Sequence, residues 1–89
     1  MKVGVNFLPT VIKILSDVLS GVKDNNISFS DLRKLLDTLG FRHRVKGSHF
    51  IYWKDEVEEI INIQSDGNKA KSYQVKQVRN IILKYKFSF

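Results

Sequence analysis

The strongest constraint on the fold lies in residues 40–54, where two strand patterns follow a helix end and flank a tight turn. Gly40 is typical of a residue that ends a helix, and Gly47-Ser48 is typical of a turn. From Phe41 to Lys46, Phe, His and Val alternate with Arg, Arg and Lys, which is the pattern of a half-buried strand. A turn this short joins antiparallel strands, so the stretch predicts a β-hairpin with a basic first strand.

The second strand of this hairpin, from His49 to Lys54, is rich in β-branched and aromatic residues. Apolar side chains occupy both of its faces. Alternation therefore does not decide whether Phe50 and Tyr52 or Ile51 and Trp53 point to the core. We expect either a β-bulge at this strand or a second face that is also covered, for example by a partner.

Two further segments follow the hairpin. A turn at residues 55–57 leads into a third predicted strand, from Glu58 to Gln64. Ser65 to Lys71 is then a polar loop, with a turn at Asp66-Gly67. The three strands follow one another with short connections, which predicts an antiparallel meander.

The helix before the hairpin has clear local start signals. Ser28 can cap its first turn, Asp31 completes a capping box three residues later, and Ile27 and Leu32 form a hydrophobic staple. Gly40 ends this helix. Its apolar stripe is formed by Leu32, Leu35, Leu36 and Leu39.

Two more helices are predicted, one near each end of the chain. The first runs from Pro9 to Ser20 and stops at Gly21, while Met1 to Leu8 has no periodicity and is expected to pack loosely. Ser72 can cap the last helix. The apolar face of that helix is formed by Val75, Val78, Ile81, Ile82 and Tyr85.

The predicted order is therefore helix, helix, three antiparallel strands, helix. Such an order favours an α+β fold of two layers, with the helices on one face of the sheet. An α-β-β-β-α core is the arrangement of the double-stranded RNA-binding domain, here with an extra N-terminal helix. We divide the 89 residues into an N-terminal extension, 1–26, and this core, 27–89.

Positive charge is concentrated at the C-terminal end. Residues 1–66 contain nine basic and nine acidic side chains, whereas residues 67–89 contain six basic and no acidic ones, so the net charge of +6 belongs to the second segment. Clustered cations favour a polyanionic partner, because neutralising phosphates releases counterions. The alternative is a solvated surface that keeps the protein soluble.

Several classes of function and location can be set aside. The chain has no cysteine, which excludes disulfides and Cys-ligated zinc. His43 and His49 lie six apart with no acidic residue between them, so we expect no metal site and no cofactor. The apolar runs are too short to span a membrane, and Lys13 interrupts the one that resembles a signal peptide. We expect a cytoplasmic protein.

Two motifs carry a resemblance to a known family. Residues 32–41 end a helix in Gly-Phe, and residues 46–52 open a strand with Gly-Ser-His. Together with the final segment 73–82, they make the chain similar to the HicA toxin family over about residues 28–87. Many HicA proteins have a Pro and a second His at the end of the third strand, where this chain has Ile63-Gln64-Ser65.

The resemblance implies an RNA-cleaving toxin of a type II toxin–antitoxin pair. Such toxins are metal-independent endoribonucleases that cut messenger RNA, and the His of Gly-Ser-His, here His49, is their catalytic residue. The implied protein partner is a HicB-type antitoxin that covers the active site.

Histidine suits this chemistry because its ordinary pKa of about 6.5 makes both protonation states available at neutral pH. We therefore predict His49 as general base or acid, with Gly47 and Ser48 offering backbone N–H groups to a phosphate. The cations predicted to bind phosphate are Lys46, Lys69, Lys71, Lys76 and Arg79.

Each of these assignments has a plainer alternative. His49 can be an ordinary exposed histidine, Ser48 is more typical of a turn than of a nucleophile, and His43 is expected to pack at the sheet edge. Trp53 and Tyr52 can stack on bases or pack in the core. Two other functions therefore stay open: a non-catalytic RNA-binding module, and a protein-interaction domain that docks through its aromatic strand.

Overall fold

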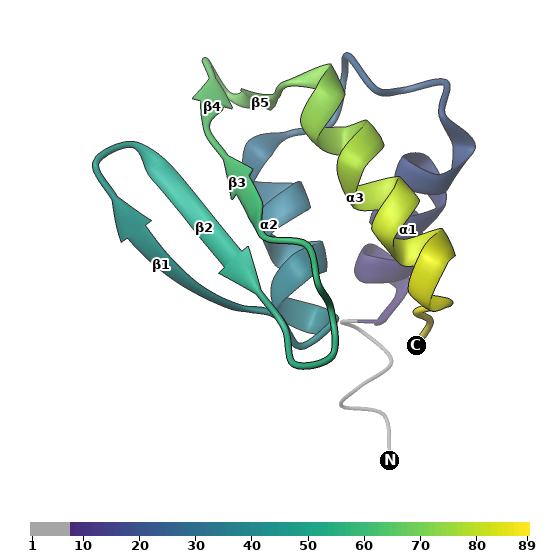
Figure 1. The fold of residues 1–89 in the computed structure, drawn as a ribbon. Helices are drawn as coiled ribbons and strands as arrows, with labels where there is room; N and C mark the ends of the chain where they lie inside the picture. Colours follow the sequence, from purple (N-terminus) through teal and green to yellow (C-terminus); the bar gives the residue numbers. More distant parts are fainter. Residues whose placement is uncertain (1–7) are drawn as a thin grey trace.

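The computed structural model describes residues 8–89 as three helices, a three-stranded sheet and a small two-stranded sheet (Figure 1). The helices are α1 (Leu8–Ser20), α2 (Phe29–Thr38) and α3 (Ser72–Tyr85). The strands are β1 (Arg42–Lys46), β2 (His49–Trp53), β3 (Ile61–Ile63), β4 (Ser65–Asp66) and β5 (Lys69–Ala70). None of the helices in this part of the chain is long and apolar enough to cross a membrane.

The main sheet is an antiparallel meander in the order β1-β2-β3, as the sequence predicts. Its register divides the side chains between two faces, because directly paired residues lie on the same face. The inner face, which we define by the residues turned to the helices, comprises His43, Val45, Phe50, Tyr52, Ile61 and Ile63. The outer face comprises Arg42, Arg44, Lys46, His49, Ile51, Trp53 and Asn62.

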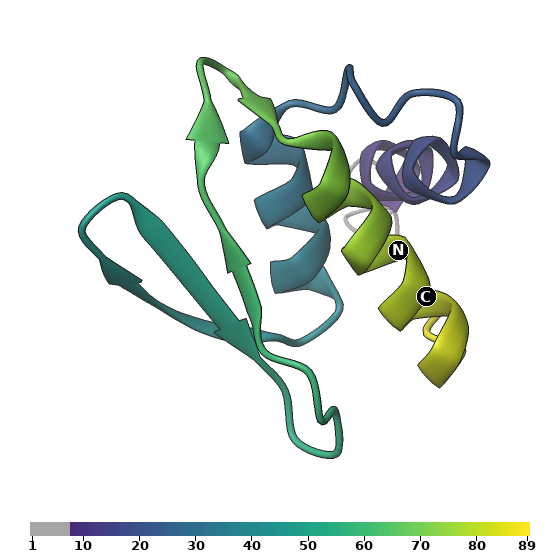
Figure 2. The same ribbon diagram turned by 45° about the horizontal axis from the view of Figure 1, so that its top comes forward.

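All three helices lie on one side of this sheet, and α1 packs against α2 and α3 on their far side from it (Figures 1 and 2). The predicted α+β class and the placement of the helices on one face are confirmed. The core joins Tyr52, Ile61 and Ile63 of the sheet to apolar residues of every helix. Val11, Ile14 and Val18 of α1 are part of that same core, so the N-terminal helix is integral to the fold.

Local signals placed two of the helices well. Ser28 caps α2 by accepting a hydrogen bond at 3.0 Å from the backbone N–H of Asp31. Gly21 and Gly40 follow α1 and α2 with positive φ angles, which only glycine adopts without strain. The expected loose segment, Met1–Leu8, lies outside the described residues except for Leu8, which begins α1.

The start of α3 differs from the prediction. Lys71, and not Ser72, is the residue that precedes the first turn, and Ser72 is already helical. The backbone N–H of Lys71 donates to the side chain of Gln74 at 3.3 Å. Gln74 is buried, and its side-chain oxygen gives this N–H an acceptor at the start of the helix.

The alternation of residues 41–46 predicts a half-buried first strand, and this prediction is wrong. All five residues of β1 are exposed, and the buried Phe41 lies just before the strand begins. The reason is the position of the hairpin, whose turn projects to the side, away from the helices (Figures 1 and 2). Val45 faces inward but remains 53% exposed, because the helical layer does not extend beneath it.

The third strand is shorter than predicted, covering residues 61–63 in place of 58–64. Residues 58 and 59 are held by the end of α3 and not by β2. The Tyr85 hydroxyl accepts from the Glu58 backbone N–H at 3.1 Å, and Glu59 accepts hydrogen bonds from Lys84 and Tyr85. The predicted polar loop 65–71 contains the small hairpin β4–β5, which turns at Gly67-Asn68.

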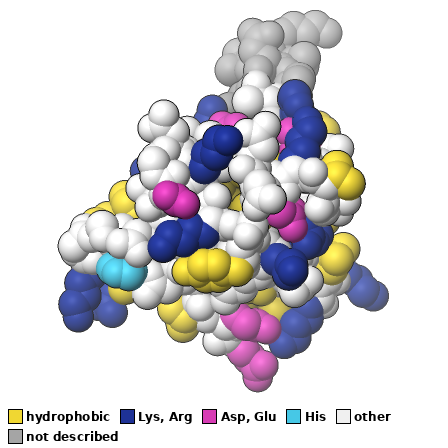
Figure 3. All heavy atoms as spheres, turned by 90° about the horizontal axis from the view of Figure 1, so that it is seen from above, with side chains coloured by type: hydrophobic (Ala, Val, Ile, Leu, Met, Phe, Trp, Pro, Cys, Tyr) yellow, Lys and Arg dark blue, Asp and Glu magenta, His cyan; other side chains and the backbone are white. Residues whose placement is uncertain are grey.

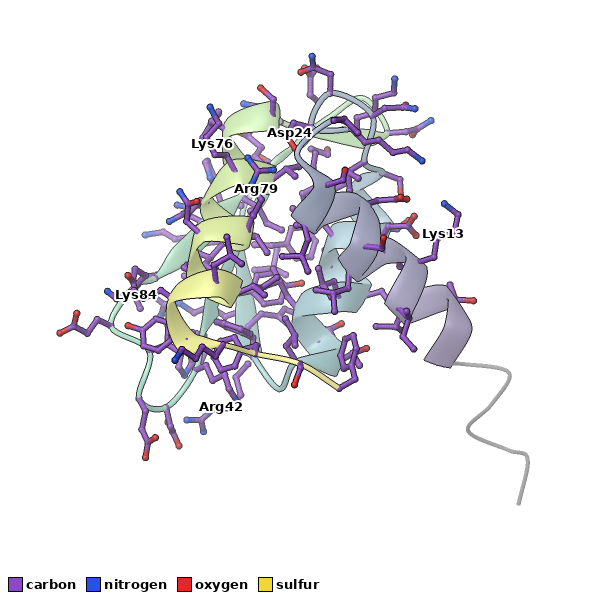
Figure 4. All side chains as sticks on the ribbon, turned by 90° about the vertical axis from the view of Figure 1, so that its right-hand side faces the viewer. Lys13, Asp24, Arg42, Lys76, Arg79 and Lys84 are labelled. Carbon is purple, nitrogen blue, oxygen red and sulfur yellow. The ribbon has the colours of Figure 1, made fainter. Side chains whose placement is uncertain are left out.

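An ion pair ties α3 to the loop between α1 and α2. Arg79 donates to both carboxylate oxygens of Asp24, at 2.8 and 3.1 Å, and to the backbone carbonyl of Val18 at 3.1 Å. The Arg79 and Asp24 side chains are only 15% and 16% exposed. Figure 4 shows Arg79 directed at Asp24, while Lys76 points outward one turn earlier.

We expect Arg79→Ala to lower the free energy of unfolding by about 1.5–3 kcal/mol, since it removes hydrogen bonds to a charged group and leaves Asp24 unpaired. Urea denaturation would measure the loss. The control is Asp55→Ala, which breaks the exposed Arg42–Asp55 pair and should cost less than about 1 kcal/mol. Equal losses in the two variants would contradict a structural role for Arg79.

Candidate functional site

His49 begins β2 and is exposed on the outer face of the sheet. Its Nδ1 lies 3.0 Å from Oδ1 of Asn62, which belongs to β3. The register explains this contact. Asn62 is paired with Ile51, two residues after His49, so the two polar side chains are diagonal neighbours on one face.

The hydrogen bond bears on which ring nitrogen carries the proton. An amide oxygen can only accept, so a contact with Oδ1 favours the tautomer in which Nδ1 is protonated and donates to Asn62. In the neutral ring this leaves the lone pair on Nε2, which is the nitrogen able to take a proton. The arrangement is therefore suited to general acid–base chemistry at Nε2.

Three other predicted residues surround His49. Lys46 is its direct partner across the hairpin, and Lys46 and Gly47 line a shallow surface hollow together with His49, Ile51 and Asn62. Ser48 follows in the turn, where its Oγ accepts a hydrogen bond at 2.7 Å from Gln64. The structure thus brings Lys46, Gly47, Ser48 and His49 together.

The C-terminal cations lie elsewhere, and none of Lys69, Lys71, Lys76 and Arg79 lines this hollow. Lys69 is exposed on β5, Lys76 is exposed on α3, and Lys71 is half-buried where α3 begins. Figure 3 views the molecule from the end at which β4, β5 and the start of α3 lie. On this face, Lys and Arg side chains are scattered among Asp and Glu and form no single patch. The phosphate-binding role of these four residues stays a prediction, and the contacts of Arg79 favour a structural role for it.

His43 and Tyr52 lie on the inner face, where the sheet meets α2. Their rings are in contact, with centroids 4.9 Å apart and planes tilted by 34°, and His43 Nδ1 lies 3.7 Å from a carboxylate oxygen of Asp37. Tyr52 is fully buried, and its hydroxyl accepts a hydrogen bond at 3.0 Å from Nε of Arg33. Burial raises the pKa of Tyr52 above its ordinary value, so the hydroxyl stays protonated at neutral pH.

Sequence reasoning missed Asn62 and Gln64, the two side chains that hold the site. Asn62 is the polar position in the apolar run Ile60 to Ile63, and alternation alone places it on the opposite face from Ile61 and Ile63. That signal was available. Its pairing with His49 depends on the register of β2 and β3, which the sequence does not state.

Within residues 8–89, no group of three or more His, Asp or Glu side chains is arranged to hold a metal ion. Comparison of the chain with models of protein families, with curated proteins and with solved structures found no match. The geometry of the site is therefore the basis for assigning a function.

The Asn62 contact can be tested on the ring itself. In Asn62→Ala, the neutral His49 imidazole should lose its preference for the proton on Nδ1, because that nitrogen loses its acceptor. Nitrogen-15 NMR of the histidine side chains would report the tautomer. The His43 ring serves as internal reference, and an unchanged His49 tautomer in the variant would show that Asn62 does not orient it.

Proposed function

We propose that this protein is a metal-independent endoribonuclease of the HicA type, the toxin of a toxin–antitoxin pair, with His49 as its catalytic residue. The observation that carries the proposal is the hydrogen bond between His49 and Asn62, which leaves Nε2 free beside Lys46. The order α2-β1-β2-β3-α3 supports the double-stranded RNA-binding-domain-like core that this family has.

The proposed reaction uses the ribose 2′-hydroxyl as nucleophile. Nε2 of His49 takes the hydroxyl proton, and the 2′ oxygen forms a bond to the adjacent phosphorus while the bond to the 5′ oxygen breaks. Solvent protonates the departing oxygen, since the hollow is open. Lys46 stabilises the negative charge that develops on the phosphoryl oxygens, together with the backbone N–H groups of Gly47 and Ser48.

The substrate of this reaction is messenger RNA, and the exposed cations Lys69 and Lys76, with the half-buried Lys71, are available to contact its flanking phosphates. The proposed protein partner is a HicB-type antitoxin that covers His49. The second candidate function is a non-catalytic RNA-binding module. One observation favours it. Within the described residues, Lys46 is the one titratable side chain besides His49 that lines the hollow, so no second histidine or carboxylate lies there to act as general acid.

The test is incubation of the purified protein with a labelled messenger RNA in EDTA, followed by analysis of the fragment ends. The expected products carry a 2′,3′-cyclic phosphate and a 5′-hydroxyl, because the 2′ oxygen is the nucleophile. Fragments with other ends would indicate another mechanism or a contaminating nuclease. Binding of the RNA without any cleavage would favour the second candidate.

A further inference from the structure

The outer face of the sheet has a feature that the proposed chemistry does not use. Beside the His49 hollow lies a second one, lined by Arg44, Ile51, Trp53 and Ile60. Ile51 lines both, so the two hollows form one continuous strip along β2. None of the three helices covers this strip, because all of them lie on the other side of the sheet (Figures 1 and 2).

One end of the strip is aromatic. Trp53 is half-buried and lines the second hollow, so part of its indole ring is accessible there. The guanidinium of Arg42 lies 5.9 Å from the Trp53 ring centroid, and Arg42 is in turn held by Asp55 at 2.8 Å. A ring held in this way can stack on an unpaired base with little further loss of freedom.

The other component of the strip is positive charge. Arg44 and Lys46 alternate along β1 on the outer face, and neither forms an ion pair or side-chain hydrogen bond with another residue of 8–89. The hairpin itself, residues 42–53, contains no acidic side chain. The next ones along the chain are Asp55 and Glu56, in the loop that follows Trp53. A polyanion is therefore attracted along the strip and repelled beyond its aromatic end.

We propose that this strip binds single-stranded RNA, with one base stacked on Trp53 and the phosphates on either side contacting Arg44 and Lys46. The inference rests on the proposed function and names its substrate class. An aromatic side chain set among cations is the arrangement by which proteins hold unpaired strands, since a paired base offers no free face for stacking. The strand rises about 3.3 Å per residue, so Trp53 lies about 13 Å along β2 from His49 and positions the RNA for cleavage there.

The experiment uses the single tryptophan of the chain as reporter. The probe is an oligouridine with 2′-O-methyl riboses, which lacks the nucleophilic hydroxyl and cannot be cut by the proposed reaction. We expect it to quench the fluorescence of Trp53, and we expect its duplex with a 2′-O-methyl oligoadenosine to bind at least tenfold more weakly. Equal affinity for the duplex would overturn the proposal.

Two variants test the contacts. Arg44→Gln with Lys46→Gln should reduce the slope of log K against log salt by about 1.4, because each phosphate contact on a single strand contributes about 0.7. Trp53→Leu should weaken binding of a dye-labelled probe at least fivefold. The control is Lys34→Gln, which removes one cation at an exposed position of α2, away from the strip, and should leave binding unchanged. Circular dichroism would verify that every variant is folded.

Several results would overturn the proposal. One is binding of the labelled probe without any change in Trp53 fluorescence, which would place the RNA elsewhere, for example at Lys69, Lys71 and Lys76. Another is an equal loss of affinity in Lys34→Gln. A third is self-association in sedimentation experiments that Trp53→Lys abolishes, which would assign the strip to a second copy of the chain.

The same measurements separate this proposal from the catalytic one. Quenching that depends on Arg44 and Lys46, with no cleavage of ordinary RNA, would support the strip and overturn the ribonuclease. Cleavage that depends on His49 but is as fast in Arg44→Gln with Trp53→Leu, which leaves Lys46 in place, as in the wild type would support the ribonuclease and overturn the strip.

Discussion

His49→Ala is expected to lower the rate of RNA cleavage by a factor of about 10²–10⁴, the contribution that a positioned acid or base usually makes. Its affinity for the non-cleavable oligouridine should stay within about twofold of the wild type. The side chain is exposed and is held by its hydrogen bond to Asn62, so the substitution removes little packing. Single-turnover cleavage in EDTA and fluorescence titration would measure the two quantities.

The matched control is His43→Ala, which removes the same ring from the opposite face of the same hairpin. It should keep the cleavage activity, because His43 packs against Tyr52 and does not line the His49 hollow. Free imidazole added to His49→Ala should restore part of the rate by occupying the vacated space. Undiminished cleavage by His49→Ala would remove His49 from the mechanism.

The second large effect is expected on stability. Tyr52→Ala should lower the free energy of unfolding by about 3–5 kcal/mol, the usual result of truncating a fully buried aromatic side chain. Tyr52 is the largest side chain buried in the core, and it anchors the hairpin on α2 through Arg33, while its ring packs against His43 of β1. Domains of this kind have only about 5–15 kcal/mol of stability, so we expect a large fall in the urea midpoint.

Tyr52→Phe is the control for this prediction. It keeps the ring in the core and removes only the hydrogen bond from Arg33, so the expected loss is about 1 kcal/mol. Equal losses from Phe and Ala would assign the effect to the hydroxyl and contradict a packing role for the ring. A loss below 1 kcal/mol from Tyr52→Ala would show that the hairpin is anchored by other contacts.

The helices and the hairpin could be predicted because their signals are local. Ser28 caps a turn that includes Asp31, and Gly40 ends the same helix, so a window of about a dozen residues defines α2. The hairpin turn at Gly47-Ser48 is equally local, and Gly47 adopts the positive φ that such a turn requires. These features depend on neighbours in the chain and not on the rest of the fold.

The face of β2 and the partner of His49 could not be predicted, because they depend on segments far apart in the sequence. Ile51 and Trp53 are as apolar as Phe50 and Tyr52, and only the position of α2 decides that the second pair faces inward. His49 meets Asn62, and Arg79 meets Asp24 across 55 residues. Arg79 was predicted as a phosphate ligand because the sequence shows its positive charge. The sequence does not show that Asp24, 55 residues away, forms an ion pair with it.

The exposure of β1 has one more consequence. An edge strand presents unpaired backbone N–H and C=O groups that can pair with the edge of another molecule, and β1 is such a strand along its whole length. Arg42, Arg44 and Lys46 oppose this, because two copies brought edge to edge would place three cations against three. Arg44 and Lys46, which are proposed to attract RNA, therefore also oppose pairing of the sheet with a second copy of itself.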